Sequence, residues 1–158
     1  MVGIGQVSLE QALAGRDQVG AVVNVSGHQR MLSQRISFLS DELLSARSEE
    51  ERAQVHQSLL HAVDLMEQSH ERLTNVDSSD DLSALLTVPV RRLYFDGPNA
   101  LDPRVRRFIE AAKHVLDADP DELTVDHPDF AYLASEAREE LLQALNALVD
   151  QYQADGER

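Results

Sequence analysis

The sequence predicts an all-α protein, folded as an antiparallel up-down four-helix bundle with a short irregular or helical connector between helices 2 and 3. The composition favours helices, because leucine, alanine, glutamate and glutamine dominate the periodic stretches while only 4% of residues are aromatic. Apolar residues recur at helical steps over several long segments. A chain of 158 residues suffices for one core, so residues 1–158 are predicted to form a single domain.

The first helix is predicted to run from Ser8, a good N-cap, to about Arg47. Steps of three and four residues separate the members of its apolar seam, which is the repeat of a helix packed at a small angle in a bundle. A helix this long needs partners along its whole length to be stable. With a glutamine at one place, the seam comprises Val22, Val25, Gln29, Leu32, Ile36, Leu39 and Leu43.

The second helix is predicted to begin after Ser48, an N-cap residue followed by three glutamates. Acidic side chains in a first turn interact favourably with the positive end of the helix dipole. The helix is expected to end near Asn75. Because the turn at Ser48 is short, the first two helices should be antiparallel neighbours.

Residues 76–99 form the least regular part of the chain. Pro89 and the Gly97-Pro98 step exclude one continuous helix there, although Leu82 to Val88 has the composition of a short helix. Tyr94 and Phe95 give this connector a small apolar anchor.

Two further helices are predicted after this connector. The third starts at Asp102, with Pro103 at its first position, and extends to Leu116. The fourth starts near His127 and runs to about Tyr152.

The charge balance bears on the kind of partner. Fourteen basic residues against 28 acidic residues give a formal net charge of -14, which opposes binding to nucleic acid. The chain has no cysteine, and no run approaches the roughly 20 apolar residues that span a bilayer. We therefore expect a soluble segment with no nucleic-acid partner.

Metal and catalytic patterns are incomplete. The triplet Asp117, Asp119 and Asp121 has calcium-loop spacing, but the glycine and the bidentate glutamate that the loop needs are missing downstream. The sequence Glu67-x-x-His70 matches half of a di-metal site and has no second copy. No nucleophile elbow or phosphate loop occurs. The sequence thus predicts no metal, no cofactor, no catalytic residue and no enzymatic activity.

A polar line beside the apolar seam is the candidate site. It contains Val23, Gly27, Arg30 and Gln34, and it is predicted to face something other than the subunit's own core. Glycine inside a helix costs about 1 kcal/mol relative to alanine, which favours a close approach of a backbone or ligand at Gly27. Arg30 lies one turn further on, and its planar fork of donors suits an oxyanion. An alternative stays open, in which the glycine is merely tolerated and the arginine is solvated.

Two segments of the chain resemble a known family. The stretch from Ser26 to Arg35 (SGHQRMLSQR) resembles the signature of the PilJ-type family, the extracytoplasmic sensor domain named after a type IV pilus methyl-accepting chemotaxis receptor. It is also similar, more loosely, to the Gly-x-x-Arg box of nitrate/nitrite sensor histidine kinases. The stretch from Leu93 to Arg106 (LYFDGPNALDPRVR) resembles the connector of the PilJ-type family before its third helix.

The resemblance implies a periplasmic sensor domain of a membrane-anchored receptor, with chemotaxis or a related signal as its output. It implies a homodimer through the first helix that holds a small anion, nitrate or nitrite, between the two subunits. The ligand-binding set expected from it is Ser26, Gly27, Arg30, Met31 and Gln34. His28 and Gln29 depart from the nitrate kinases, so other ligands stay open. The alternative is a structural or protein-interaction bundle without a small-anion ligand.

Overall fold

The computed structural model describes residues 27–74, 88–137 and 141–156, and every regular element in these ranges is helical. The prediction of an all-α protein is therefore confirmed. After an unlabelled helix at 27–45 the elements are α2 (Glu49–Thr74), α3 (Val88–Phe95), α4 (Leu101–Asp117), the 3-10 helix η2 (Pro120–Glu122), α5 (Pro128–Ser135) and α6 (Leu141–Gly156).

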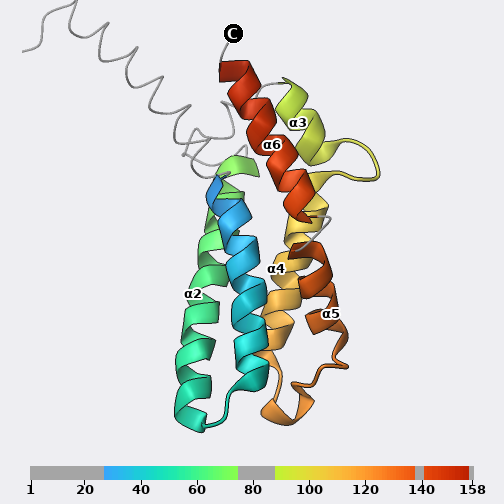
Figure 1. The fold of residues 1–158 in the computed structure, drawn as a ribbon. Helices are drawn as coiled ribbons and strands as arrows, with labels where there is room; N and C mark the ends of the chain where they lie inside the picture. Colours follow the sequence, from blue (N-terminus) through green and yellow to red (C-terminus); the bar gives the residue numbers. More distant parts are fainter. Residues whose placement is uncertain (1–26, 75–87, 138–140, 157–158) are drawn as a thin grey trace, which may run out of the picture.

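The helices stand side by side as a bundle (Figure 1). The helix at 27–45 and α2 run in opposite directions and are joined by the tight link at 46–48. On the other side α4 contacts α2, α3, α5 and α6, so it packs against four of the labelled helices. The short helix α3 packs on α4 and α6, at the end of the bundle where the chain terminates (Figure 1).

The predicted start of the second helix is confirmed in detail. The Ser48 hydroxyl accepts a hydrogen bond from the backbone N–H of Glu51 at 3.1 Å, which is the N-cap contact. The Glu51 carboxylate accepts in return from the backbone N–H of Arg47 at 3.2 Å. This reciprocal pair resembles a capping box and fixes the direction in which α2 leaves the link.

Part of the connector, predicted to be irregular because of its prolines, is helical: α3 spans Val88–Phe95. Pro89 is the second residue of α3, a place where the missing N–H leaves no helical hydrogen bond unmade, so it helps to begin a helix. Gly97 has a φ of 81°, a left-handed conformation that suits glycine, and it turns the chain from α3 into α4. The helix expected at 82–88 lies outside the described residues apart from Val88.

The fourth predicted helix, from His127 to Tyr152, contains two described helices, with residues 138–140 outside the described ranges. The structure has α5 from Pro128, a wide π-type turn at 136–137, and then α6, which continues to Gly156. The wide turn falls at Glu136, which is only 8% exposed and whose carboxylate lies 3.5 Å from Nη2 of Arg104. Periodicity does not reveal such a turn, because the apolar spacing continues on both sides of it.

The apolar seam of the first helix lies in the core. Leu32, Ile36, Leu39 and Leu43 are buried, and Gln29 is only 1% exposed, as the spacing predicts. Val22 and Val25 lie outside the described residues. The largest buried side chains of the other helices are Leu59, Met66, Leu73, Tyr94, Leu101, Phe108, Leu133, Leu141, Leu145 and Leu148.

No helix in the described part of the chain combines the length and the apolar character that crossing a membrane requires.

Candidate anion-binding site

The polar line of the first helix lies on its exposed side. Gly27 is half-buried, and Arg30 and Gln34 are exposed, while Gln29 and Ser33 turn inward and are buried. Met31 shares the exposed side with a 52% exposed side chain. The structure therefore brings four of the five predicted ligand-binding residues onto one helix surface, and the fifth, Ser26, lies outside the described residues.

Gly27 borders open space within its own chain. A Cβ atom built at this position meets no other atom within 4 Å, apart from its neighbours and the backbone of its own helix. Packing against the described part of the subunit therefore gives no reason for a glycine here. A close approach at Gly27 requires something beyond the described part of the subunit.

Arg30 reaches across to the last helix. Its Nη1 donates a hydrogen bond to Oδ1 of Asn146 in α6 at 3.0 Å, over 116 positions of the sequence. A guanidinium carries five N–H donors, and among the described residues this bond to a neutral amide neither neutralises its charge nor uses most of its donors. The hydrogen bond holds the guanidinium between the first helix and α6.

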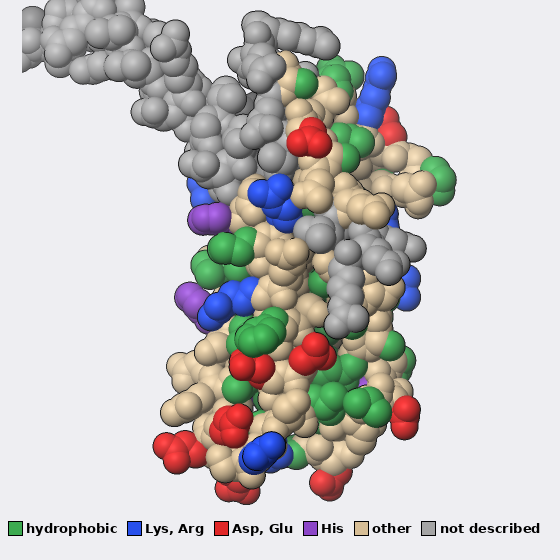
Figure 2. All heavy atoms as spheres, in the orientation of Figure 1, with side chains coloured by type: hydrophobic (Ala, Val, Ile, Leu, Met, Phe, Trp, Pro, Cys, Tyr) green, Lys and Arg blue, Asp and Glu red, His purple; other side chains and the backbone are tan. Residues whose placement is uncertain are grey.

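Apolar and basic side chains alternate along this surface. Phe38, two turns after Met31, is 61% exposed, an unusual degree for a phenylalanine in a soluble helix. Figure 2 shows hydrophobic and basic side chains along the helix at 27–45, whereas most acidic side chains in this view gather toward the opposite end of the bundle. The surface around Arg30 is thus locally less acidic than the net charge of -14 indicates.

Arg35 is separated from the Gly27 line by its helical position. Five residues at 100° each place it about 140° around the helix from Arg30. Among the described residues, none forms an ion pair with Arg35. Arg35 is instead an exposed side chain.

Gln29 belongs to the packing of the helix and not to its exposed surface. Its Nε2 donates to the backbone carbonyl of Met66 in α2 at 3.3 Å. Its Oε1 is buried without a hydrogen-bond partner among the described residues. Of the two residues between Gly27 and Arg30, only the exposed His28 is therefore in a position to alter a ligand at the surface.

The second motif contributes to a network in the interior. His70 of α2 is 1% exposed, its Nε2 lies 2.7 Å from Oδ1 of Asp102, and its ring lies 6.0 Å from that of Tyr94, centroid to centroid. Arg106 donates to Asp102 at 2.9 Å and to Glu71 at 3.2 Å. The motif therefore joins α2, α3 and α4, at a different place from the Gly27 line.

Sequence reasoning missed this network, because it favoured an exposed or hydrogen-bonded bundle residue over a metal ligand at His70 and named no partner for it. The available signal was the spacing of Asp102 and Arg106, four residues apart on one helix face within the motif. Burial lowers the pKa of His70 below its usual value of 6.5, and the hydrogen bond to Asp102 opposes that shift only in part. The imidazole is therefore neutral near pH 7, with Nε2–H donating to the carboxylate.

Glu67 and His70, which match half of a di-metal site in sequence, both contact other side chains. Glu67 forms an ion pair with Lys113 of α4, and the same pairing raises the pKa of Lys113. His70 is engaged with Asp102. Within the ranges that the structure describes, no group of three or more histidines, cysteines and acids is arranged to hold a metal ion.

Comparison with known proteins identifies the family. The family model described as "Type IV pili methyl-accepting chemotaxis transducer N-term" (PilJ) matches residues 12–131. A comparison with curated proteins and a comparison with solved structures each gave no match. The matched range contains both motifs, extends into α5, and covers well over half of the chain. The family is one of signalling domains, and PilJ domains lie in chemotaxis transducers that are usually membrane-anchored. The chain belongs to the PilJ family of chemotaxis transducer N-terminal domains.

Proposed function

We propose that this chain is the ligand-binding sensor domain of a membrane-anchored receptor, and that it binds a small oxyanion, nitrate before nitrite, at a surface shared by two subunits. Gly27 and Arg30 of each subunit are the central residues of this site. Ser26, Met31 and Gln34 complete it, and the periplasm is the expected compartment. The proposal assumes the up-down four-helix arrangement, in which the first helices of two subunits pack together.

One observation carries the proposal. Arg30 is exposed and held by a neutral partner, next to a glycine around which the described part of its own subunit leaves open space. Charge-assisted hydrogen bonds from an arginine fork to an oxyanion are roughly twice as strong as neutral ones. An anion between two such forks would replace the repulsion of two guanidinium groups by attraction.

The proposed site also provides a coupling mechanism. If both subunits contribute one Arg30, the anion binds the dimer more tightly than the monomer, and by linkage it shifts the helix-to-helix geometry. The first helix packs on α2 through Gln29 and the apolar seam, so a change at its exposed side also reaches the interior.

The test is a thermal-shift screen of small anions on the parent protein and on Arg30→Ala. A binding ligand raises the melting temperature by mass action, so nitrate should stabilise the parent and not the variant. Chloride and sulfate serve as controls for ionic strength. Equal stabilisation of both proteins would place the anion elsewhere.

A second candidate function is favoured by the exposed Met31 and Phe38. Exposed apolar side chains of this size on one helix are typical of a protein-protein contact, which needs no small ligand. In that case the bundle serves structure or interaction within a receptor or a pilus-linked system. Absence of any anion effect at millimolar concentration, together with a stable dimer, would favour this function.

A further inference from the structure

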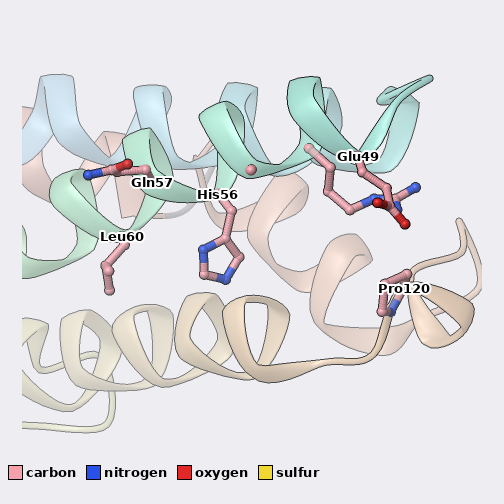
Figure 3. A pocket seen from close by; sticks show the side chains of 7 residues that line it. Glu49, His56, Gln57, Leu60 and Pro120 are labelled. Carbon is pink, nitrogen blue, oxygen red and sulfur yellow. The ribbon is translucent and has the colours of Figure 1, made fainter.

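A groove on α2 lies at the end of the bundle away from Gly27, where the link at 46–48 leads into α2. Its volume is about 560 Å³, and its wall is formed by the first three turns of α2 and by Pro120 of η2 (Figure 3). Sites for small organic ligands commonly have volumes of about 300–1,000 Å³. The groove is therefore large enough for a small molecule.

The groove lies on the face of α2 that, further along the helix, is covered by α4. Toward its C-terminal end, this face of α2 is joined to α4 by the ion pairs of Glu67 with Lys113 and Glu71 with Arg106. Nearer the N-terminus of α2, Glu49, Ala53 and Leu60 lie on the same face of the helix. They line the groove there and are not covered by α4. Leu60 is 43% exposed, so a large apolar side chain remains uncovered there.

His56 lines the groove and connects α2 to α4. Its ring points from α2 toward α4 (Figure 3), and its Nε2 lies 2.9 Å from the carbonyl oxygen of Leu116. Leu116 is in the last turn of α4, where carbonyl groups lack a helical donor, so Nε2–H donates to its carbonyl oxygen. This hydrogen bond joins α2 to the end of α4 beside the groove.

The polar groups of the groove carry both signs of charge. Arg52 is half-buried, and no ion pair with a described residue neutralises its guanidinium. Glu49 lies three residues earlier, so the two side chains leave the helix about 5–6 Å apart. The groove therefore offers one guanidinium and one carboxylate from neighbouring positions of α2, which complement in charge the carboxylate and the ammonium of an α-amino acid.

The surroundings favour a ligand without net charge. Most acidic side chains on the face that Figure 2 shows gather at this end of the bundle, so a simple anion would be repelled over a long range. A zwitterion carries no net charge and escapes this repulsion. Beyond the charged pair, Ala53, Leu60 and Pro120 offer an apolar surface for a side chain.

We propose that this groove is a second ligand site, which binds a free α-amino acid with an aliphatic side chain. Arg52 binds the α-carboxylate, Glu49 binds the α-ammonium, and Leu60 contacts the side chain. The site is separate from the proposed anion site, because it uses no residue of the Gly27 line.

The experiment titrates the whole chain with L-leucine and follows backbone NMR shifts at Ala53 and His56. Saturable shifts at millimolar concentration are expected. Arg52→Gln and Glu49→Gln should each weaken binding about tenfold or more, since each removes a charge-assisted contact. Leu60→Ser should weaken binding of leucine and leave binding of glycine unchanged. Glu50→Gln and Arg47→Gln, which lie near the groove without lining it, are the matched controls.

Blocked ligands separate the two charged contacts. Leucinamide lacks the carboxylate and N-acetyl-leucine lacks the ammonium, so both should bind at least about tenfold more weakly than leucine. Equal binding of N-acetyl-leucine would show an organic acid site and overturn the zwitterion assignment, as would unaltered affinity in Arg52→Gln. Absence of saturable shifts would overturn the site itself. Arg30→Ala should leave leucine binding unchanged, so failure here and failure of the anion site are distinguishable.

Discussion

Nε2 of His70 in α2 lies 2.7 Å from Oδ1 of Asp102 at the start of α4, and this hydrogen bond joins the two helices in the interior. Nδ1 of the same ring is buried and has no partner among the described residues. Arg106 and Glu71 are the other charged groups that act on the ring, and a cavity of about 240 Å³ adjoins it. A neutral histidine, a carboxylate and an arginine therefore interact where the second motif, Leu93 to Arg106, packs against α2.

The first prediction concerns the pH dependence of stability. Because burial lowers the pKa of His70 in the folded state, the folded protein binds fewer protons than the unfolded chain as pH falls below 6.5. The contribution of His70 is fully present above that pH and is lost as pH falls through 6.5 toward the lowered pKa. Melting temperature should therefore decrease on acidification from pH 7.5 to about 5.

Two variants separate this effect from general acid sensitivity. His70→Gln keeps a donor for Asp102 and cannot titrate, so its melting temperature should depend less steeply on pH, whatever its absolute stability. The exposed His61→Gln should keep the slope of the parent protein. An identical slope in all three proteins would exclude His70 as the source.

Local features of the sequence were sufficient for much of the fold. The seam from Leu32 to Leu43 and the cap at Ser48 depend on residues within a few turns, so spacing alone predicts them. The wide turn at Glu136 was not predictable in this way, because it lies where Glu136 meets Arg104, 32 residues earlier.

In the candidate site, too, features set by local spacing were predictable and contacts between distant residues were not. The exposure of Gly27, Arg30 and Gln34 follows from their angle to the seam, and the sequence therefore predicts it. The contact of Arg30 with Asn146 requires the rotation and register of α6 against the first helix, which no local pattern specifies. The bond between His70 and Asp102 is of the same kind, since it joins residues 32 positions apart.

The second prediction concerns Gly27→Ala. The added methyl group meets open space in the subunit, and alanine is about 1 kcal/mol better than glycine in a helix, so the isolated fold should become slightly more stable. Anion binding should weaken, because the methyl group keeps the two first helices apart. Chemical denaturation measures the first effect and calorimetric titration with nitrate the second. A variant that binds nitrate as tightly as the parent would exclude the close-contact role.

The third prediction compares the two arginines of the first motif. Hydrogen bonds to charged partners are worth roughly 1.5–3 kcal/mol each, so loss of two symmetry-related Arg30 forks should weaken nitrate binding at least about a hundredfold. Arg35→Ala should have little effect, because its side chain points about 140° away from Arg30 around the helix. Calorimetric titration of both variants provides the comparison. Binding that survives Arg30→Ala and fails in Arg35→Ala would move the site to another side of the helix.

Asn146→Ala tests how Arg30 is held. Removing the amide leaves the guanidinium charged but no longer fixed against α6, so nitrate affinity should decrease by less than in Arg30→Ala. Arg30→Lys should bind weakly, since an ammonium lacks the planar fork. Equal affinity of the parent and Asn146→Ala would show that the anion itself orients Arg30.

The fourth prediction concerns the apolar part of the same surface. Phe38 is 61% exposed and lies outside the core, so Phe38→Ser should change the free energy of unfolding of the monomer by no more than about 0.5 kcal/mol. If the first helices of two subunits meet along this surface, the same change removes a large apolar contact from the dimer and should weaken dimerisation. Sedimentation velocity over a dilution series, with and without nitrate, measures the monomer fraction.

Two results of that measurement have opposite meanings. A monomer fraction that rises in Phe38→Ser and falls when nitrate is added supports one surface that serves both dimerisation and anion binding. Leu93→Ser, a change at an exposed leucine of α3, is the matched control and should leave the monomer fraction unchanged. A dimer that resists Phe38→Ser but yields to Leu93→Ser would place the interface on α3, and Arg30 would then have to bind its anion within a single subunit.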